Sequence, residues 1–206
     1  KASNVITRYV DKNKQTEIVP EITQSGYQGD QYTTDKKDIS GYTYDSVVGE
    51  TAGTYGDSTK IITYYYIKNT SVEVKYVDKV TGEEISTRTA IPGLPGDAYV
   101  TTPKTIDDYT LERTPDNASG TMTDELTTIT YEYLLNASVT SKYVDKETGK
   151  ELAPSETYNG QEGKDYETEN KDIKYYKLVE IPSDASGKYE VDRTTNPYTT
   201  TKEVIY

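Results

Sequence analysis

The chain has 206 residues, with 23 basic and 35 acidic side chains and a formal net charge of −12. It contains no Cys and no His, which excludes disulfide scaffolds, metal sites built on those residues, and Cys–His or Ser–His–Asp catalysis. The acidic balance argues against a nucleic-acid partner, because phosphates are bound by clustered Lys and Arg. Its 22 Tyr, with many Val, Ile and Thr, favour strands over disorder.

An internal repeat organises the chain. The tetrapeptide Tyr-Val-Asp-Lys begins at residues 9, 76 and 143, so both spacings are 67 residues. Glycines and further tyrosines recur at the same offset, for example Gly26, Gly93 and Gly160. We therefore predict three copies of one unit, 1–67, 68–134 and 135–206, called repeats 1, 2 and 3 below.

One departure from the repeat is localised. From the last shared glycine to the closing tyrosine is 13 residues in repeat 2 (Gly120 to Tyr133) and 19 in repeat 3 (Gly187 to Tyr206). The six extra residues fall near 193–198, and we expect them to form a longer surface turn.

Within repeat 2 the predicted elements are mainly strands. Val72–Val77 alternates apolar and polar residues, which indicates a half-buried strand, and Asp78–Glu83 supplies the turn of a hairpin. Gly93–Asp97 is a second break. Thr101–Tyr109 is the one stretch that could hold a helical turn, with a length limited by Pro103.

Two more strands, at 109–111 and 127–133, complete the predicted repeat. The closing strand of each repeat is connected to the next repeat through only a few residues, 67–71 and 134–138. Such short connections restrict bending, so we expect an elongated rod of three domains.

Tyrosine suits a small unit with a thin core, because the ring buries a large area while the hydroxyl reaches water or a backbone group. We therefore assign Tyr9, Tyr32, Tyr42 and Tyr66, which have counterparts in every repeat, to the core or its edge.

These residues together resemble the MucBP (mucin-binding protein) repeats of Gram-positive surface adhesins. The shared pattern in repeat 2 comprises Val72–Asp78, Thr81–Gly82, Gly93–Tyr99, Tyr109–Leu111, Ser119–Gly120 and Thr128–Tyr133. The resemblance covers the chain three times. Repeat 1 departs from it, with Gln15-Thr16 where Thr-Gly is expected and Arg8 where the others have Lys.

The resemblance implies a strand-dominated α+β unit of the β-grasp (ubiquitin-like) kind, displayed in tandem on an extracellular, cell wall-anchored protein. It also implies host mucin or another glycoprotein as the partner, and it identifies no binding residues. We expect a monomer that binds neither nucleic acid nor a cofactor or metal. We also expect that the chain does not insert into a membrane, because no apolar run approaches the length of a membrane helix.

Catalysis, calcium binding and an intramolecular isopeptide bond are poorly supported. The one acid present in all repeats is Asp11, Asp78 or Asp145, which we interpret as a turn-capping residue. Calcium binding would need a loop of spaced oxygen ligands, and the acidic pairs 107–108 and 124–125 do not recur in the other repeats. An isopeptide bond would need a lysine on the first strand, and repeat 1 has Arg8 at the position where repeats 2 and 3 have lysine. We therefore expect the chain not to be an enzyme.

Two functions remain open from the sequence. The first is weak, multivalent binding of glycans by exposed tyrosine rings, for which the candidates are those not shared by all repeats: Tyr27, Tyr44, Tyr65, Tyr158 and Tyr175. The second is a mechanical stalk that projects a distal binding domain from the cell wall.

Overall fold

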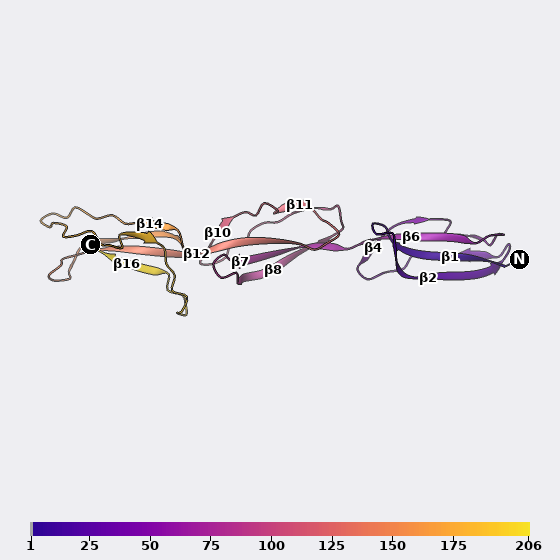
Figure 1. The fold of residues 1–206 in the computed structure, drawn as a ribbon, viewed down its shortest axis with the longest axis horizontal. Helices are drawn as coiled ribbons and strands as arrows, with labels where there is room; N and C mark the ends of the chain where they lie inside the picture. The colour runs from indigo at the N-terminus through magenta and orange to yellow at the C-terminus, as the bar shows by residue number, and fades with distance from the viewer. Residues whose placement is uncertain (1) are drawn as a thin grey trace. The chain divides into compact units, whose positions relative to one another are not determined.

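The computed structural model describes residues 2–206, which divide into two compact units. The first unit comprises the chain up to residue 74 with 89–101 and 117–129, and the second comprises 75–88, 102–116 and 130–206. The division passes through repeat 2, and the units are described separately. Figure 1 shows that both are built from strands joined by extended segments.

Repeat 1 lies in the first unit as one mixed sheet. Its strands, in spatial order, are β2 (Thr16–Tyr27), β1 (Ala2–Asp11), β6 (Lys60–Lys68) and β4 (Tyr42–Val48). The first strand, β1, is antiparallel to β2 and parallel to the last strand, β6, which is antiparallel to β4. Two small antiparallel pairs also lie in this unit: β3 (Gln31–Thr33) with β5 (Ala52–Thr54), and β9 (Ala98–Val100) with β11 (Ser119–Thr121).

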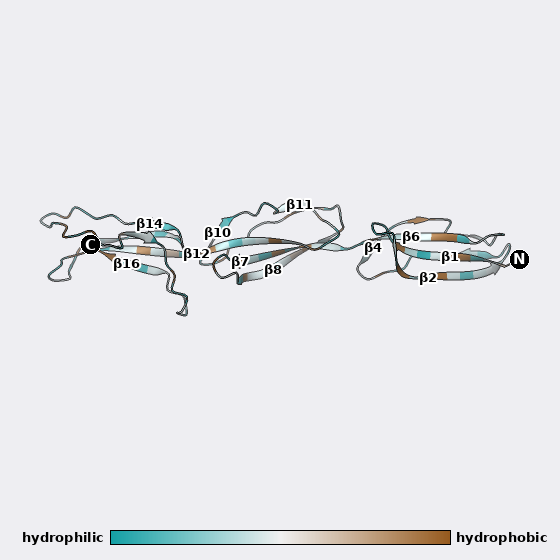
Figure 2. Cartoon of the chain, viewed as in Figure 1, coloured by the Kyte–Doolittle hydropathy of each residue, from teal (hydrophilic) through white to brown (hydrophobic). Residues whose placement is uncertain are grey.

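The core of repeat 1 follows from alternation along its strands. On β1 every second residue is buried, including Val5 and Tyr9, and on β6 the buried residues are Ile62, Tyr64 and Tyr66. The rings of Tyr9 and Tyr64 stack with centroids 5.7 Å apart. Hydrophobic and hydrophilic residues are mixed along β1, β6 and β12 in Figure 2, as a sheet with one buried face requires.

The remaining strands form a second sheet around one long strand, β12. The order is β10 (Tyr109–Arg113), β12 (Thr127–Val144), β7 (Thr70–Asp78) and β8 (Glu84–Gly93), and β12 also pairs with β13 (Glu151–Gln161) and β16 (Thr201–Ile205). The pairing of β12 is antiparallel with β13 and parallel with β16. A small pair joins β14 (Asp165–Glu167) and β15 (Ser186–Lys188). Strand β12 runs through the predicted 134–138 junction without a break.

The fourth strand of repeats 1 and 2 has no counterpart in repeat 3. Strands β4 and β10 begin at Tyr42 and Tyr109, which pair with Lys68 and Leu135. The equivalent segment after Tyr176 is not a strand. In repeats 1 and 2 the first two pairs of this ladder use residues that follow the closing tyrosine.

The predicted helical turn at Thr101–Tyr109 is wrong, and with it the α part of the α+β class: residues 2–206 contain no helix. The cause is a tyrosine hydroxyl that takes the place of helical hydrogen bonds. The Tyr133 hydroxyl accepts from Lys104 N at 3.0 Å and donates to Lys104 O at 2.8 Å, and Tyr66 holds Lys37 in the same way. These bonds satisfy the backbone in an extended conformation.

The assignment of shared tyrosines to the core is confirmed with one exception. Buried members occur in every repeat: Tyr9, Tyr32 and Tyr66; Tyr76, Tyr99 and Tyr133; and Tyr143 and Tyr166. Tyr42 packs against the core of repeat 1. Its repeat 3 counterpart, Tyr176, is 51% exposed, because the strand that would seat it is not formed.

Candidate binding surface

The recurring aspartate caps the first turn of each repeat, as predicted. Asp78 Oδ1 accepts from Val80 N at 2.7 Å and Thr81 N at 3.1 Å. Asp11 and Asp145 accept two backbone N–H groups each in the same way. This acid therefore has a structural role in all three repeats.

The five candidate tyrosines lie in different environments. Tyr27 is 70% exposed and Tyr175 is 90% exposed, whereas Tyr44, Tyr65 and Tyr158 are half-buried. Tyr44 is part of the core edge, with its ring centroid 5.9 Å from that of Tyr66. Tyr65 alternates with buried neighbours on β6 and therefore points to the opposite sheet face from Tyr44.

Tyr158 is held by hydrogen bonds. Its hydroxyl donates to Glu156 Oε2 at 3.1 Å and accepts from Glu169 N at 3.2 Å. This leaves Tyr27 and Tyr175 as the two predicted rings that are freely presented to solvent.

The backbone of Tyr175 is unusual for an aromatic residue. Its φ is 72°, in the left-handed region, and the equivalent positions are Gly41 at 80° and Asp108 at 64°. Glycine adopts this conformation without cost and aspartate tolerates it, whereas a residue such as tyrosine loses roughly 1–2 kcal/mol. Lys174 Nζ lies 4.8 Å from the centroid of the Tyr175 ring. The turn therefore presents a strained, exposed ring, the kind of outlier that is found at functional positions.

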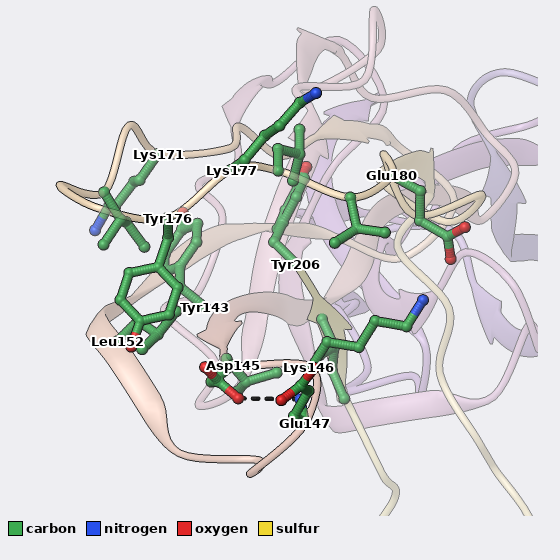
Figure 3. Close-up of a pocket in the computed structure, with 15 residues that line it drawn as sticks. Tyr143, Asp145, Lys146, Glu147, Leu152, Lys171, Tyr176, Lys177, Glu180 and Tyr206 are labelled. Carbon is green, nitrogen blue, oxygen red and sulfur yellow. Dashed lines mark hydrogen bonds between the residues drawn. The ribbon is translucent and has the colours of Figure 1, made fainter.

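A groove of about 380 Å³ lies next to this turn in repeat 3. Figure 3 shows Lys171, Tyr176, Lys177 and Glu180 on the segment that borders the groove. Asp145, Lys146 and Glu147 line it from the turn after β12, and the side chains of Tyr143, Tyr206 and Leu152 also contribute. The sequence does not single out Tyr176, because its counterparts Tyr42 and Tyr109 recur at the same offset and this recurrence indicates a core position.

The groove is bordered by a neutral phenol and a fixed ammonium group. Burial, followed by the nearby Glu156 carboxylate, raises the pKa of Tyr143 to about 12. Its hydroxyl donates to Glu169 O at 2.9 Å. Lys171 Nζ lies 4.6 Å from the Tyr143 ring centroid and donates to Pro154 O at 2.9 Å. The arrangement can offer aromatic faces and hydrogen-bonding groups to a polar ligand.

A metal site is not apparent in the described part of the chain, where no three acidic side chains gather in a way that could hold an ion. Among the same residues there is no helix of the length and hydrophobicity needed to cross a membrane.

Comparison with models of known protein families shows to which family the chain belongs. The family model of the MucBP domain matches residues 4–67, 71–134 and 138–206. The chain belongs to the MucBP family. MucBP repeats are tandem modules of adhesin-like surface proteins.

The MucBP chain is also similar to listerial proteins. Internalin J of Listeria monocytogenes serotype 4b (strain F2365) is 40% identical over 210 residues, which cover 98% of this chain and 23% of that protein. Internalin I of L. monocytogenes serovar 1/2a (strain ATCC BAA-679 / EGD-e) is 32% identical over 184 residues, covering 86% and 10%. The chain thus spans about a quarter or less of the length of these relatives.

Solved structures show a more distant likeness. Mub-RV is 12% identical with a TM-score of 0.25, over 63% of this chain and 97% of that chain. The type 2 repeat of the mucus binding protein MUB from Lactobacillus reuteri is 13% identical with a TM-score of 0.24, over 65% and 99%.

Proposed function

We propose that this chain is a non-catalytic adhesion module that binds the glycans of host mucin or other glycoproteins weakly and multivalently. It would act as a monomeric part of an extracellular protein anchored to the cell wall. Membership of the MucBP family supports adhesion as the class of function. The observation that supports a specific contact is Tyr175, an exposed ring on a turn where the fold itself favours glycine.

Sugar rings present C–H groups that pack on aromatic faces, and their hydroxyls pair with amide and hydroxyl groups. Tyr175 and the half-exposed Tyr176 provide two adjacent rings beside the groove. Tyr27 provides an exposed ring on repeat 1. One such contact gives little affinity, and a tandem array compensates through effective concentration.

The strain at residue 175 allows a decisive experiment. Tyr175→Gly removes the ring and also relieves the left-handed backbone, so it should stabilise the fold by roughly 1 kcal/mol. Retention of the variant on immobilised mucin should nevertheless fall severalfold. Asp108→Gly is the matched control, because it places glycine at the same turn of repeat 2 without removing a ring. Aspartate already tolerates the left-handed conformation, so this variant should change the melting temperature little and leave retention unchanged.

Two results would count against this proposal in different ways. If Tyr175→Gly binds mucin as well as the parent chain, the ring is not a contact, and the adhesion site lies elsewhere. If the folded parent chain itself is not retained at micromolar concentration, the module does not bind mucin.

The second candidate function is a stalk, and strand β12 favours it. We propose that the repeats are β-grasp units without the helix, arranged end to end. The parallel pairing of the first and last strands supports the β-grasp assignment. The end-to-end arrangement is supported by the single residue between β6 and β7 and by the continuity of β12. Three units of strands of 8–10 residues would measure on the order of 100 Å. Small-angle scattering from a compact particle would contradict this arrangement.

A further inference from the structure

The six-residue insertion of repeat 3 forms an ordered loop. Asp192 and Thr199 pair at its base, with N–H to O distances of 2.8 and 3.0 Å in the two directions. Asp192 Oδ1 also accepts from Thr194 N at 2.9 Å, and the Thr195 and Thr199 hydroxyls lie 3.0 Å apart. These bonds fix the residue that follows Asp192, which is Arg193.

Arg193 extends from repeat 3 to the capping aspartate of repeat 2. Its Nη2 donates to Asp78 Oδ2 at 2.8 Å and to Glu162 Oε2 at 2.5 Å. The side chains are 20% exposed for Arg193, 1% for Asp78 and 12% for Glu162. The insertion is a surface turn, as expected, and among residues 193–198 Arg193 alone is half-buried.

The neighbours of this ion pair complete its environment. The Tyr109 hydroxyl donates to the same Asp78 Oδ2 at 3.0 Å, and Arg193 Cζ lies 5.2 Å from the ring centroid of Tyr198, also in the insertion. The hydrogen bonds from a guanidinium and a phenol offset the cost of removing the buried Asp78 carboxylate from water. The fork of an arginine suits a site in which two carboxylates must be joined.

A second cation of repeat 3 makes a similar contact. Lys164 Nζ lies 2.9 Å from Glu112 Oε1 of repeat 2, and Lys79 Nζ lies 3.4 Å from the same oxygen. Glu112 is 17% exposed. Arg193 and Lys164 thus place two positive charges of repeat 3 on two acids of repeat 2.

The junction between repeats 1 and 2 is built differently. Asp11 is as buried as Asp78, yet its Oδ2 has no hydrogen-bond partner among the described residues. Repeat 2 contains no basic residue between Gly120 and Tyr133, and Asp97 stands where repeat 3 has Lys164. Exposed side-chain hydrogen bonds cross this junction from Asn13 to Asp124 at 3.2 Å and from Thr43 to Asn69 at 2.7 Å. The second of these has a counterpart at the other junction, from Thr110 to Asn136 at 2.6 Å.

Both junctions share one backbone connection. Asn69 N donates to Gly41 O at 2.8 Å, and Asn136 N donates to Asp108 O at 2.7 Å. The difference between the junctions therefore lies in the charged side chains and in the insertion loop, together with the unbroken strand β12.

From these contacts we infer that the insertion is an inter-repeat clamp, in which Arg193 locks repeat 3 to the end of repeat 2, and that the junction between repeats 1 and 2 lacks this lock. Arg193 is a positioning residue. It fixes the direction in which repeat 3 continues from repeat 2, whichever function the repeats perform. The clamp predicts two junctions of unequal stiffness in one chain.

The absence of native cysteine makes this measurable in the full chain. Thr23, Ala90 and Thr157 are exposed equivalents at the 67-residue offset, in β2, β8 and β13. Spin labels on cysteines at 90 and 157 report the clamped junction, and labels at 23 and 90 report the other. In the parent chain the distance distribution for 90/157 should be clearly narrower than that for 23/90.

Arg193→Gln should broaden the 90/157 distribution to the width of the 23/90 distribution and leave the latter unchanged. Arg8→Gln is the matched control, because Arg8 pairs with Glu21 within repeat 1 in an exposed contact of 3.0 Å. It should change neither distribution. Lys164→Asp, which copies repeat 2 at a half-exposed position, should broaden 90/157 without disturbing the core.

The inference fails if the two parent distributions are equally wide. It also fails if Arg193→Gln and Lys164→Asp, with folding verified by circular dichroism, both leave the 90/157 distribution as narrow as in the parent chain.

Discussion

A glycine that recurs in each repeat packs against a tyrosine ring in repeats 1 and 3 and against a methionine in repeat 2, which allows a matched test of core rigidity. A Cβ added at Gly160 would lie 2.2 Å from Tyr189 Cε2, whereas one added at Gly93 would lie 2.6 Å from Met122 Sδ. Neither glycine has the positive φ that would strain alanine. Gly→Ala therefore adds one methyl group against a ring in repeat 3 and against a thioether in repeat 2.

The expected costs differ because the two neighbours differ in mobility. Tyr189 is 7% exposed, and its ring centroid lies 5.4 Å from that of Tyr166, so it has little room to move. Overpacking of this kind costs roughly 1–3 kcal/mol, and we expect Gly160→Ala to lie near the upper end, at about 3 kcal/mol. Met122 is unbranched and can change rotamer. Replacing glycine by alanine also stabilises the folded state by ~0.4–1 kcal/mol, because it lowers the conformational entropy of the unfolded chain. The net cost of Gly93→Ala should therefore be less than about 1 kcal/mol.

Urea denaturation of the full chain, followed by hydrogen exchange of peptides from each repeat, measures both costs. Met122 is the single methionine, so its methyl resonance should shift in Gly93→Ala and stay in place in Gly160→Ala. Equal destabilisation by the two variants, or a larger loss for Gly93→Ala, would refute the argument from side-chain mobility.

Three further outcomes are expected. Tyr76→Ala removes a ring that is 2% exposed and stacked 5.8 Å from Tyr131, and it should lower the free energy of unfolding of repeat 2 by ~3–5 kcal/mol; hydrogen exchange should show that repeat 1 stays protected. Burial, then the hydrogen bond to Asp78, raises the pKa of Tyr109 from 10.0 to about 12. The stabilisation of the fold by the neutral Tyr109 hydroxyl is fully present below pH 10 and is lost as the pH rises through about 12. The fall of the urea midpoint at alkaline pH should therefore be smaller in Tyr109→Phe than in the parent chain. Added salt should not weaken retention on mucin, because a chain of net charge −12 is not attracted to an acidic glycoprotein; a steep loss of binding with salt would contradict this.

The sequence predicted the features that repeat. The spacing of the tyrosines identified the buried rings, and the position of Asp78 before a Gly-containing turn identified a capping carboxylate, because both depend on local pattern and alternation. The extended segment around Lys104 was less predictable. Its conformation is set by hydrogen bonds to the hydroxyl of Tyr133, 29 residues along the chain.

The differences between repeats were harder to predict. The length of the insertion was visible, yet the partner of Arg193 is Asp78, 115 residues away in sequence. Tyr44 is not shared by the other repeats, a pattern that predicts a surface ring, whereas its contact with the core depends on the register of β4 on β6. The exposure of Tyr176 follows from a missing strand rather than from any residue at that position.

The parallel pairing of first and last strands has a mechanical consequence. In repeat 1 the seven paired positions of β1 and β6 run from Val5–Lys60 to Asp11–Tyr66. A pull on the start of β1 and the end of β6 acts along these strands in opposite directions, so the hydrogen bonds between them are loaded together in shear rather than opened one after another. The same holds for β12 and β16 in repeat 3. Resistance to such a pull is governed by the barrier to unfolding rather than by equilibrium stability, so a module with a thin tyrosine core can still resist a force applied at its two ends.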